Sequence, residues 1–308
     1  METGVAVLWD SEVEEGRDRP FEIEGLNETY RYFSDQVRAA GSDLYVAKYS
    51  WYNDSNLEKA YKYEDGSWVK VENVKVEAVF DKYRWDDTTI KMKKKVQRSH
   101  PVVNRLEMER LCKDKLESFS KFPDMVAETM VASSETVENV LETGKAVIKP
   151  RYDFGGNGVR IIDSATEFEE GESLLVQRFV DSSFGIPQLG VKGVHDLRVV
   201  VVAGEPVCAY VRTPDSGLIS NVSMGGSMEN VELDDVPEPA MNIVDEVDSR
   251  LETFEERVYS VDMVFDESGK PWVLELNSKP GLNFYGDESV EKWKKPVVDR
   301  IAELLTSL

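Results

Sequence analysis

The stretch SVDMVFDESGKPWVLELN at residues 260–277 predicts two β-strands joined by a tight turn at Ser268 and Gly269. A symmetric hairpin around this turn places Asp262 directly opposite Glu275, with Asn277 two residues further along the same face. Like charges that face each other across two strands destabilise a sheet, so a cation is expected at this point. Two carboxylates and an amide oxygen are hard ligands of the kind that Mg²⁺ prefers in proteins.

The same register pairs Phe265 with Trp272, and Met263 with Leu274, on the apolar side of the hairpin. The alternative to a metal site is a pair of solvated carboxylates on an exposed face. The length of the turn decides between the two interpretations, because a loop that is one residue longer would place the two carboxylates on opposite faces.

A glycine-rich stretch, KPRYDFGGNGV at residues 149–159, follows a predicted strand that ends at Lys149. Adjacent glycines adopt positive φ at little cost and let backbone N–H groups turn toward an anion. A lysine beside such a loop suits a polyphosphate, although the sequence has neither the ending of a Walker loop nor the Rossmann glycine spacing. An ordinary hairpin turn is the alternative interpretation.

The chain has 308 residues and a formal net charge of −22, with a sequence pI near 4.6. This acidity argues against general nucleic-acid binding, which requires a basic face. Two cysteines are too few for a disulfide framework, and two histidines leave little for a zinc site. The apolar runs are too short for a membrane span, and the amino terminus has no basic-then-apolar leader. We therefore expect a soluble, cytoplasmic protein.

The alternation of predicted strands and helices indicates an α/β (α+β) chain. From about residue 108 the predicted strands and helices are interrupted by glycine-rich breaks, which suggests a second domain. An opening β-α-β pattern predicts a small open-sheet domain before this point. The predicted strands lie at residues 5–9, 43–49, 74–80, 146–149, 174–180, 197–202, 207–212, 259–265 and 272–277. The predicted helices lie at residues 26–40, 134–141, 239–254 and 288–305. The basic run Lys91–Lys95 is expected to form a solvated helix turn, with an acidic partner as the alternative.

The order and spacing of these pieces resemble the ATP-grasp superfamily, and within it the RimK-type and glutathione-synthetase-like carboxylate–amine ligases. The resemblance covers about residues 104–308 and is carried by Asp114-Lys115, VIKP at 147–150 with the glycine loop, VQRFV at 176–180, DLR at 196–198, Arg212, Asn221 with Gly225-Gly226, Asp262 and ELNSKPG at 275–281. It implies an N-terminal Rossmann-like pre-ATP-grasp domain at residues 1–107. A two-lobed ATP-grasp domain at residues 108–308 would follow, with lobes at about 108–173 and 174–308.

The resemblance also implies roles for individual residues. Those that would contact the ATP phosphates are Lys115, Lys149 and, as a flexible lid, Gly155, Gly156, Asn157 and Gly158. The strand edge that would receive adenine and ribose comprises Gln177, Phe179, Val180 and Asp181. One or two Mg²⁺ ions, or Mn²⁺, would be held by Asp262, Glu275 and Asn277. The acyl phosphate and the intermediate formed from it would meet Arg198, Arg212 and Asn221.

The function that the resemblance implies is an ATP- and Mg²⁺-dependent ligase that joins a carboxylate to an amine through an acyl phosphate and releases ADP and phosphate. Its substrates would be small molecules, peptides or protein ends. Neither nucleic acid nor membrane is expected as a partner, and a homo-oligomer is left open. A kinase that stops at phosphoryl transfer and a non-catalytic ATP-binding module are the alternatives. The ligase chemistry requires no side-chain nucleophile, which agrees with a sequence that has no convincing Ser/His/Asp or Cys/His set.

Arg198 and Arg212 flank a second predicted hairpin and are expected to share one face if the turn is centred on Glu205. Two adjacent guanidinium groups repel each other, so an anion is expected between them. In the ligase interpretation this anion is the transferred phosphoryl group or the tetrahedral oxyanion. His195 is expected to be structural or a phosphate contact, and Cys208 an inert core residue.

Overall fold

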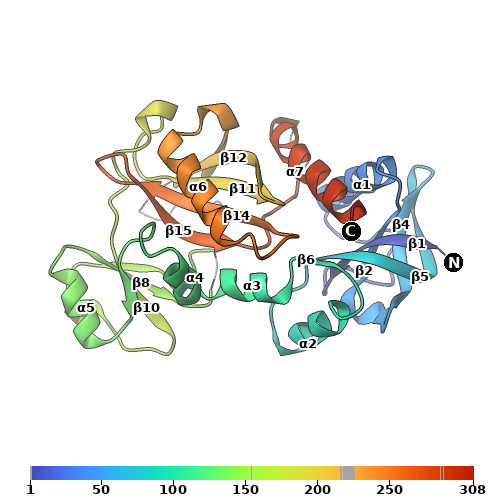
Figure 1. Ribbon diagram of the computed structural model, residues 1–308, viewed down its shortest axis with the longest axis horizontal. Coiled ribbons are helices and arrows are strands. Elements are labelled where there is room, and N and C mark those ends of the chain that lie inside the picture. The colour runs from blue at the N-terminus through green and yellow to red at the C-terminus, as the bar shows by residue number, and fades with distance from the viewer. Residues whose placement is uncertain (1, 154, 216, 218–225, 285, 287) are drawn as a thin grey trace. The chain divides into compact units, whose positions relative to one another are not determined.

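The computed structural model describes the chain except for residues 1, 154, 216, 218–225, 285 and 287 (Figure 1). Contacts between residues divide the chain into two compact units. Unit 1 consists of Met1–Met108, Phe254–Val258 and Lys279–Leu308, and unit 2 consists of Glu109–Thr253 and Tyr259–Ser278. The closing segment, residues 279–308, thus packs with the N-terminal part, whereas the prediction from the sequence is one domain at residues 108–308. The domain limits themselves stay a prediction.

Unit 1 is a sheet covered by helices, in keeping with the predicted β-α-β opening. Its elements are β1 (Thr3–Trp9), α1 (Glu24–Ala39), β2 (Leu44–Lys48), β3 (Tyr52–Asn53), β4 (Asn56–Glu64), β5 (Ser67–Asp81), α2 (Asp87–Val96), β6 (Val102–Val103) and α7 (Glu288–Thr306). The strand order is β3-β4-β2-β1-β5-β6, and β1 is parallel to both β2 and β5. Helix α1 buries the predicted apolar stripe that includes Tyr30 and Phe33, and it packs against α7.

The basic run on α2 differs from the predicted solvated helix turn. The segment is helical, but Lys93 is buried and its ammonium group donates to both carboxylate oxygens of Asp81 at 3.0 Å. Lys279 donates to the same carboxylate at 3.0 Å. Because Asp81 is fully buried at the end of β5, its charge requires cationic partners, and Lys93 is one of them.

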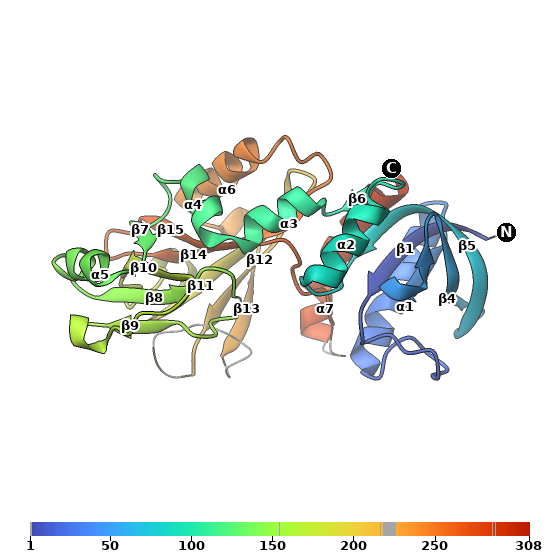
Figure 2. The same cartoon turned by 90° about the horizontal axis from the view of Figure 1, so that it is seen from below.

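The first lobe of unit 2 is a four-stranded antiparallel sheet. Its elements are α4 (Lys115–Lys121), β7 (Thr129–Val131), α5 (Ser134–Leu141), β8 (Ala146–Pro150), β9 (Arg160–Ile162) and β10 (Leu174–Arg178), and α3 (Leu106–Lys113) precedes them. Helix α5 packs on β8 and β10 through Val137 and Val140 (Figure 2). The strand order is β7-β10-β8-β9, so the first lobe extends through Arg178, past the predicted lobe boundary at residues 173–174.

The second lobe is a five-stranded sheet in the order β13-β12-β11-β14-β15. Its elements are β11 (Asp196–Val202), β12 (Glu205–Thr213), β13 (Ser227–Val231), α6 (Glu238–Arg250), β14 (Val258–Phe265) and β15 (Pro271–Asn277). Helix α6 packs against β15 and buries Val244 and Val247 (Figure 1). Cys208 is buried in β12, as expected for a core residue.

The turn of the β14–β15 hairpin is longer than predicted. The Asp266 N–H donates to the Lys270 carbonyl at 3.0 Å, so residues 267–269 form the loop in place of a two-residue turn. The apolar pairs next to the turn consequently shift by one position, and Phe265 faces the residue before Trp272. The predicted pairs Phe265–Trp272 and Met263–Leu274 are therefore wrong, whereas Val261 faces Leu276 as predicted.

A β-bulge further along the same hairpin restores the pairing that forms the site. The register shifts between Asp262 and Met263 because Leu274 is an extra residue on β15. Beyond the bulge, Asp262 lies directly opposite Glu275, as predicted. The longer turn and the bulge cancel each other, so both carboxylates remain on one face.

The β11–β12 hairpin also contains a bulge. Its turn is Ala203-Gly204, with φ of 50° and 88°, and is not centred on Glu205 as predicted. Val207 is an extra residue that shifts the register near the turn. This shift brings Arg198 and Arg212 to the same face, as expected, whereas an unbroken ladder from the same turn would place them on opposite faces.

Candidate active site

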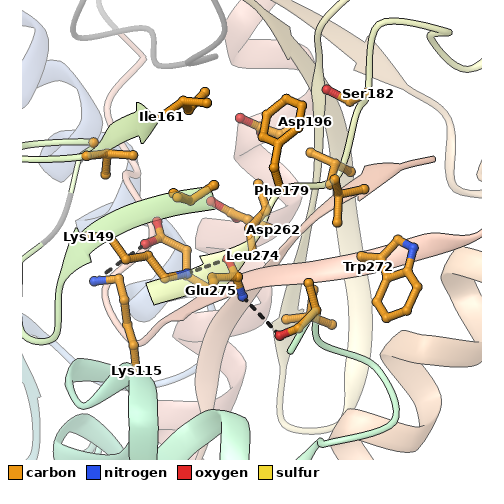
Figure 3. Close-up of a pocket in the computed structure, with 18 of the residues that line it drawn as sticks. Lys115, Lys149, Ile161, Phe179, Ser182, Asp196, Asp262, Trp272, Leu274 and Glu275 are labelled. Carbon is orange, nitrogen blue, oxygen red and sulfur yellow. Dashed lines mark hydrogen bonds and ion pairs between the residues drawn. The ribbon is translucent and has the colours of Figure 1, made fainter. Parts of the chain in front are cut away.

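A cavity of about 350 Å³ lies within unit 2 and is lined by residues of both lobes. Figure 3 shows side chains that converge on it from β8, β14, β15 and the start of α4. Its volume falls within the range of small-molecule sites. The predicted site residues that line it are Lys115, Lys149, Gly155, Gly156, Asn157, Gln177, Phe179, Val180, Arg198, Arg212, Asp262, Glu275 and Asn277. The fold therefore gathers the predicted phosphate, base and metal residues around one space.

Lys149 is buried on β8 and has a neutral partner. Its ammonium group donates to Gln177 Oε1 at 2.9 Å and lies 4.6 Å from the centre of the Phe119 ring. Burial and the charge of Lys115 lower the pKa of Lys149 to about 7, against the opposing effect of Glu275. Among the described residues no carboxylate forms an ion pair with this ammonium group, so it favours an incoming anion.

Lys115 approaches both the glycine loop and the facing carboxylates. It stands in the first turn of α4, where Asp114 caps the helix by accepting the backbone N–H of Leu116 at 3.1 Å. The Lys115 ammonium group donates to the Asp153 carbonyl and lies 4.0 Å from Glu275 Oε2. Burial lowers the pKa of Lys115, while the charge of Glu275 acts in the opposite direction.

The glycine loop is tied to α4 at its stem. Arg151 binds the Asp114 carboxylate through Nε and Nη2, each at 2.6 Å. Gly155 and Gly156 have φ of 73° and 74°, a region that strains other residues, and both line the cavity with Asn157. The loop thus has a fixed beginning and exposes its backbone to the cavity.

Asp262 and Glu275 face the cavity from β14 and β15, as Figure 3 shows. Asp262 is 1% exposed, whereas the side chain of Glu275 is 21% exposed. The Asn277 amide nitrogen lies 3.1 Å from Glu275 Oε1 and 3.4 Å from Asp262 Oδ2. The three predicted metal ligands are therefore connected by hydrogen bonds, and Glu275 is the one whose carboxylate is partly exposed.

Both arginines bind Asp262. Arg198 uses Nε at 2.6 Å from Oδ1 and Nη2 against Oδ2. Arg212 places Nη2 at 2.6 Å from the same Oδ2, and its Nε lies 2.6 Å from Asp196 Oδ1. Burial opposes the charge of Asp262, but the two guanidinium groups outweigh it and lower the pKa of this carboxyl group. The anion between the arginines is thus a protein carboxylate, and the sequence had predicted a substrate anion there.

The donor chemistry of the group fits a divalent cation. Within the described part of the chain, no three His, Cys, Asp or Glu side chains form a group suited to a metal ion. Mg²⁺, however, usually keeps several waters and shares its shell with substrate phosphates, so two carboxylates and an amide suffice beside a polyphosphate. The assignment of Asp262, Glu275 and Asn277 as metal ligands stays a prediction.

Two predicted residues do not line the cavity. Gly158 packs against Pro150, where an added Cβ would lie 2.8 Å from the proline Cγ. Asp181 is exposed, and its Oδ1 accepts the Ser183 N–H at 2.9 Å. Its carboxylate therefore closes a local turn, which does not favour the predicted ribose contact. The predicted catalytic residue Asn221 lies outside the described residues.

The segment predicted as a strand edge for adenine is central in the sheet. β10 pairs with β7 on one side and with β8 on the other, and Gln177 uses its side chain to hold Lys149. The pairing continues to Phe179, whose N–H donates to the Lys145 carbonyl at 3.1 Å. Val180 borders the cavity, and its backbone N–H and carbonyl have no hydrogen-bond partner among the described residues. Val180 is thus the first position where a base edge could find free backbone groups.

Asp196 and Trp272 line the cavity without having been assigned a role from the sequence. Asp196 is buried and lies opposite Arg212 across β11 and β12. Its position two residues before Arg198 places both on one face of β11, which is the sequence signal that could have identified it. Trp272 forms part of the apolar wall, and no sequence pattern distinguishes it from a core residue.

His195 lines the cavity, and the contacts of its ring favour the structural role expected for it. The side chain is buried, and its Nε2 accepts the backbone N–H of Phe265 at 3.2 Å. Its Nδ1 lies 3.1 Å from the Gly193 carbonyl, to which the proton on this nitrogen is donated. Burial lowers the pKa of His195, so the neutral ring links β14 to the start of β11.

Unit 2 has two lobes, and its cavity combines lysines, a glycine loop and facing carboxylates, as the resemblance to the ATP-grasp superfamily implies. Residues 114–264 match the family described as prokaryotic glutathione synthetase, ATP-grasp domain. This match confirms the resemblance that the motifs predicted. Among the described residues, no helix is both long enough and apolar enough to cross a membrane.

Individual relatives agree with this assignment. The chain is 33% identical over 122 residues to the glutathione synthetase of Anaplasma centrale, and the match covers 38% of each chain. The chain thus spans about two fifths of the length of that relative. A solved D-cycloserine synthetase aligns over 99% of both chains with a TM-score of 0.64 and 14% identity. A RimK domain ATP-grasp protein from Sphaerobacter thermophilus aligns over 98% of this chain and 99% of its own with a TM-score of 0.60 and 18% identity. The structural likeness is one of fold.

Proposed function

We propose that the protein is an ATP-dependent ligase that joins a carboxylate to an amine through an acyl phosphate and releases ADP and phosphate. The observation that carries this proposal is the single cavity in which Lys149, the glycine loop, Glu275 and Arg212 meet. This lining combines cations for a polyphosphate with carboxylates for a divalent cation. The match to the ATP-grasp domain of glutathione synthetases supports the same chemistry.

ATP is the proposed phosphoryl donor. Lys115 and Lys149 would meet its phosphates, and the backbone of Gly155 and Gly156 would lie over them. The base would lie beside Phe179 and find hydrogen-bond partners in the backbone of Val180. Lys149 supports this arrangement most directly, because the hydrogen-bond partner of its buried ammonium group within the described part of the chain is a neutral amide.

Mg²⁺, as one or two ions, is the proposed cofactor, with Mn²⁺ as a substitute. Asp262, Glu275 and Asn277 would hold it, and Glu275 presents the most accessible carboxylate of the set. When bound, the ion would neutralise charge on the phosphate oxygens and orient the γ-phosphoryl group.

The proposed reaction has two steps. A carboxylate oxygen of the first substrate attacks the γ-phosphorus of ATP, the bond from that phosphorus to the bridging oxygen breaks, and ADP leaves. The amine nitrogen of the second substrate attacks the acyl carbon, phosphate leaves with its bonding electrons, and the nitrogen loses a proton. Arg212 would stabilise the oxyanion of the second step, and the remaining work is positioning and charge neutralisation.

The substrate classes are an amino acid, a small peptide or a protein end that supplies the carboxylate or the amine. A cytoplasmic location stays a prediction, and the oligomeric state is left open.

The test is a screen of amino acids and dipeptides in pairs, scored by ADP release and product mass. We expect ADP release to require both a carboxylate and an amine, and the product mass to equal the sum of the two substrates minus water. ADP release without an amine, with a product that gains a phosphoryl group on a hydroxyl, would identify a kinase. ATP binding without ADP release for any pair would favour a non-catalytic module.

A further inference from the structure

We propose that the two arginines of the cavity have different tasks. Arg212 binds the reacting oxyanion, whereas Arg198 positions the carboxylate of Asp262. Asp196 is a further positioning residue, which acts through Arg212. The inference rests on the proposed function in one respect, namely that the cavity takes a nucleotide and a divalent cation.

Arg198 uses two of its three guanidinium nitrogens to bind Asp262. Its Nε and Nη2 form a two-pronged contact with both carboxylate oxygens, the strongest geometry that a guanidinium group offers to a carboxylate. Its Nη1 lies 3.5 Å from the hydroxyl of Tyr210, the residue opposite on β12. To bind a substrate anion in the same way, Arg198 would have to release Asp262, which is 1% exposed and would be left with fewer partners for its charge.

Arg212 uses Nε and Nη2 for its two ion pairs, which leaves Nη1 for a ligand. Asp196 accepts from its Nε at 2.6 Å, and Asp262 accepts from its Nη2 at 2.6 Å. No described residue accepts a hydrogen bond from its Nη1, although the side chain lines the cavity. An oxyanion can therefore reach two N–H donors on Nη1 without breaking either ion pair.

The charges of the four residues explain why both arginines can stay in place. Asp196, Arg212, Asp262 and Arg198 alternate in sign along the contacts and carry no net charge together. A preorganised donor of this kind needs little rearrangement when charge develops beside it. In this network Asp196 holds the Nε of Arg212 and Arg198 holds both oxygens of Asp262, while the contact of Arg212 Nη2 with Asp262 joins the two pairs.

The first arm of the test measures Mn²⁺ affinity by electron paramagnetic resonance, with and without ADP. Arg198→Lys keeps the charge but loses the planar fork, so Asp262 is no longer oriented. Loss of such a supporting contact typically weakens metal binding about 10-fold or more. Arg212→Lys and Asp196→Asn should leave the Mn²⁺ affinity within about threefold of wild type, because Arg198 still holds both oxygens of Asp262.

The second arm measures the affinity of inorganic phosphate for the protein loaded with Mg²⁺ and ADP. Arg212→Lys and Asp196→Asn should each weaken phosphate binding about 10-fold, and Arg198→Lys should change it by less than about threefold. The double variant of Asp196 and Arg212 should lose no more than Arg212→Lys alone, because the proposed effect of Asp196 on phosphate passes through Arg212. A purely structural role would instead shift the metal and phosphate affinities together.

The third arm uses wild-type protein, so that it does not depend on the folding of any variant. In ¹⁵N spectra of the arginine side chains, addition of inorganic phosphate to the complex with Mg²⁺ and ADP should shift the Nη signals of Arg212 and leave those of Arg198 in place. Equal shifts for both arginines would overturn the proposal. So would equal losses of Mn²⁺ affinity in the two Arg→Lys variants.

These outcomes are distinguishable from failure of the proposed function. If no substrate pair releases ADP while the metal and phosphate arms behave as described, the division of tasks stands and the ligase proposal fails. If ADP and Mn²⁺ do not bind at all, both fail.

Discussion

The two sheets that line the cavity differ in the partners of their buried cations: a neutral amide in the four-stranded sheet and carboxylates in the five-stranded sheet. The four-stranded sheet presents Lys149 against a neutral amide, and the pKa of this lysine falls to about 7. The five-stranded sheet presents Arg198 and Arg212 already paired with Asp262, and burial is outweighed there by the carboxylate charge, so the pKa of both arginines rises above the ordinary value. Among the described residues no carboxylate forms an ion pair with Lys149, whereas the two arginines on the other side of the cavity are paired with Asp262.

The two sheets therefore differ in whether their cations are already neutralised before a ligand binds. Lys149 carries an unfavourable charge in the nucleotide-free protein, and a polyphosphate would relieve it. The arginines are stable without ligand, so they are held in position in advance. Charge substitutions should therefore act mainly on stability in the five-stranded sheet and mainly on affinity in the four-stranded sheet.

The largest effect is expected for Asp262→Asn. The substitution leaves two arginines without the carboxylate between them, and breaking a buried ion pair on one side costs about 3 kcal/mol. Urea denaturation of the nucleotide-free protein should show this loss. Asp235→Asn, at an exposed position that follows β13 of the same sheet, is the matched control. A loss below about 1 kcal/mol would mean that the network does not stabilise the five-stranded sheet.

Glu275→Gln should lower turnover about 100-fold or more while leaving stability unchanged or slightly higher. The reason is that Glu275 lies opposite Asp262, so its removal relieves this repulsion, which offsets the loss of its ion pair with Lys115, and it weakens the proposed cation site. Glu267→Gln, the same change in the exposed turn, is the control. Near wild-type turnover at saturating Mg²⁺ would contradict the assignment of Glu275 to the metal.

Gln177→Glu would give the buried cation of the four-stranded sheet, Lys149, a carboxylate partner, as the arginines of the five-stranded sheet already have. A carboxylate in contact with Lys149 should stabilise the free protein and weaken ADP binding about 10-fold, because the nucleotide would then replace an existing counterion. Isothermal titration gives the affinity, and the exposed Gln188→Glu is the control for the added charge. Equal ADP affinity in wild type and Gln177→Glu would show that Lys149 does not face the phosphates.

The smallest effect concerns pH. The folded-state pKa of Lys149, about 7, lies below its ordinary value of 10.5, so the unfolded chain binds more protons between these values. The destabilising effect of its charge is thus fully present below pH 7 and fades as the pH rises toward 10.5.

Wild type should accordingly gain stability relative to Lys149→Met as the pH rises from 7 to 9, and ADP binding at pH 8 should take up a fraction of a proton. Lys145→Met, an exposed lysine nearby, should show neither effect. Calorimetry in buffers of different ionisation enthalpy measures the uptake, and zero uptake at pH 8 would exclude a neutral Lys149 in the free protein.

Much of the fold and of the site could be predicted from local pattern. Strand β14 was expected at residues 259–265 and spans Val258–Phe265, and α5 spans Ser134–Leu141 as expected. Alternation of apolar and polar residues and serine capping are local signals, so short segments encode these elements. The motif residues that line the cavity were likewise identifiable, because their types follow from the charge of a polyphosphate and a divalent cation.

The sequence by itself therefore determined the longer strands and helices, their order and the residue types that face phosphate and metal, whereas short elements such as β7, β9 and β13 were not predicted. Only the tertiary structure decided their partners. The bulges at Leu274 and Val207 set which face each charged residue occupies, and a bulge depends on packing along both strands, which turn chemistry alone does not show. The neutral partner of Lys149 and the carboxylate between Arg198 and Arg212 come from strands far apart in the chain, so no local pattern could reveal them.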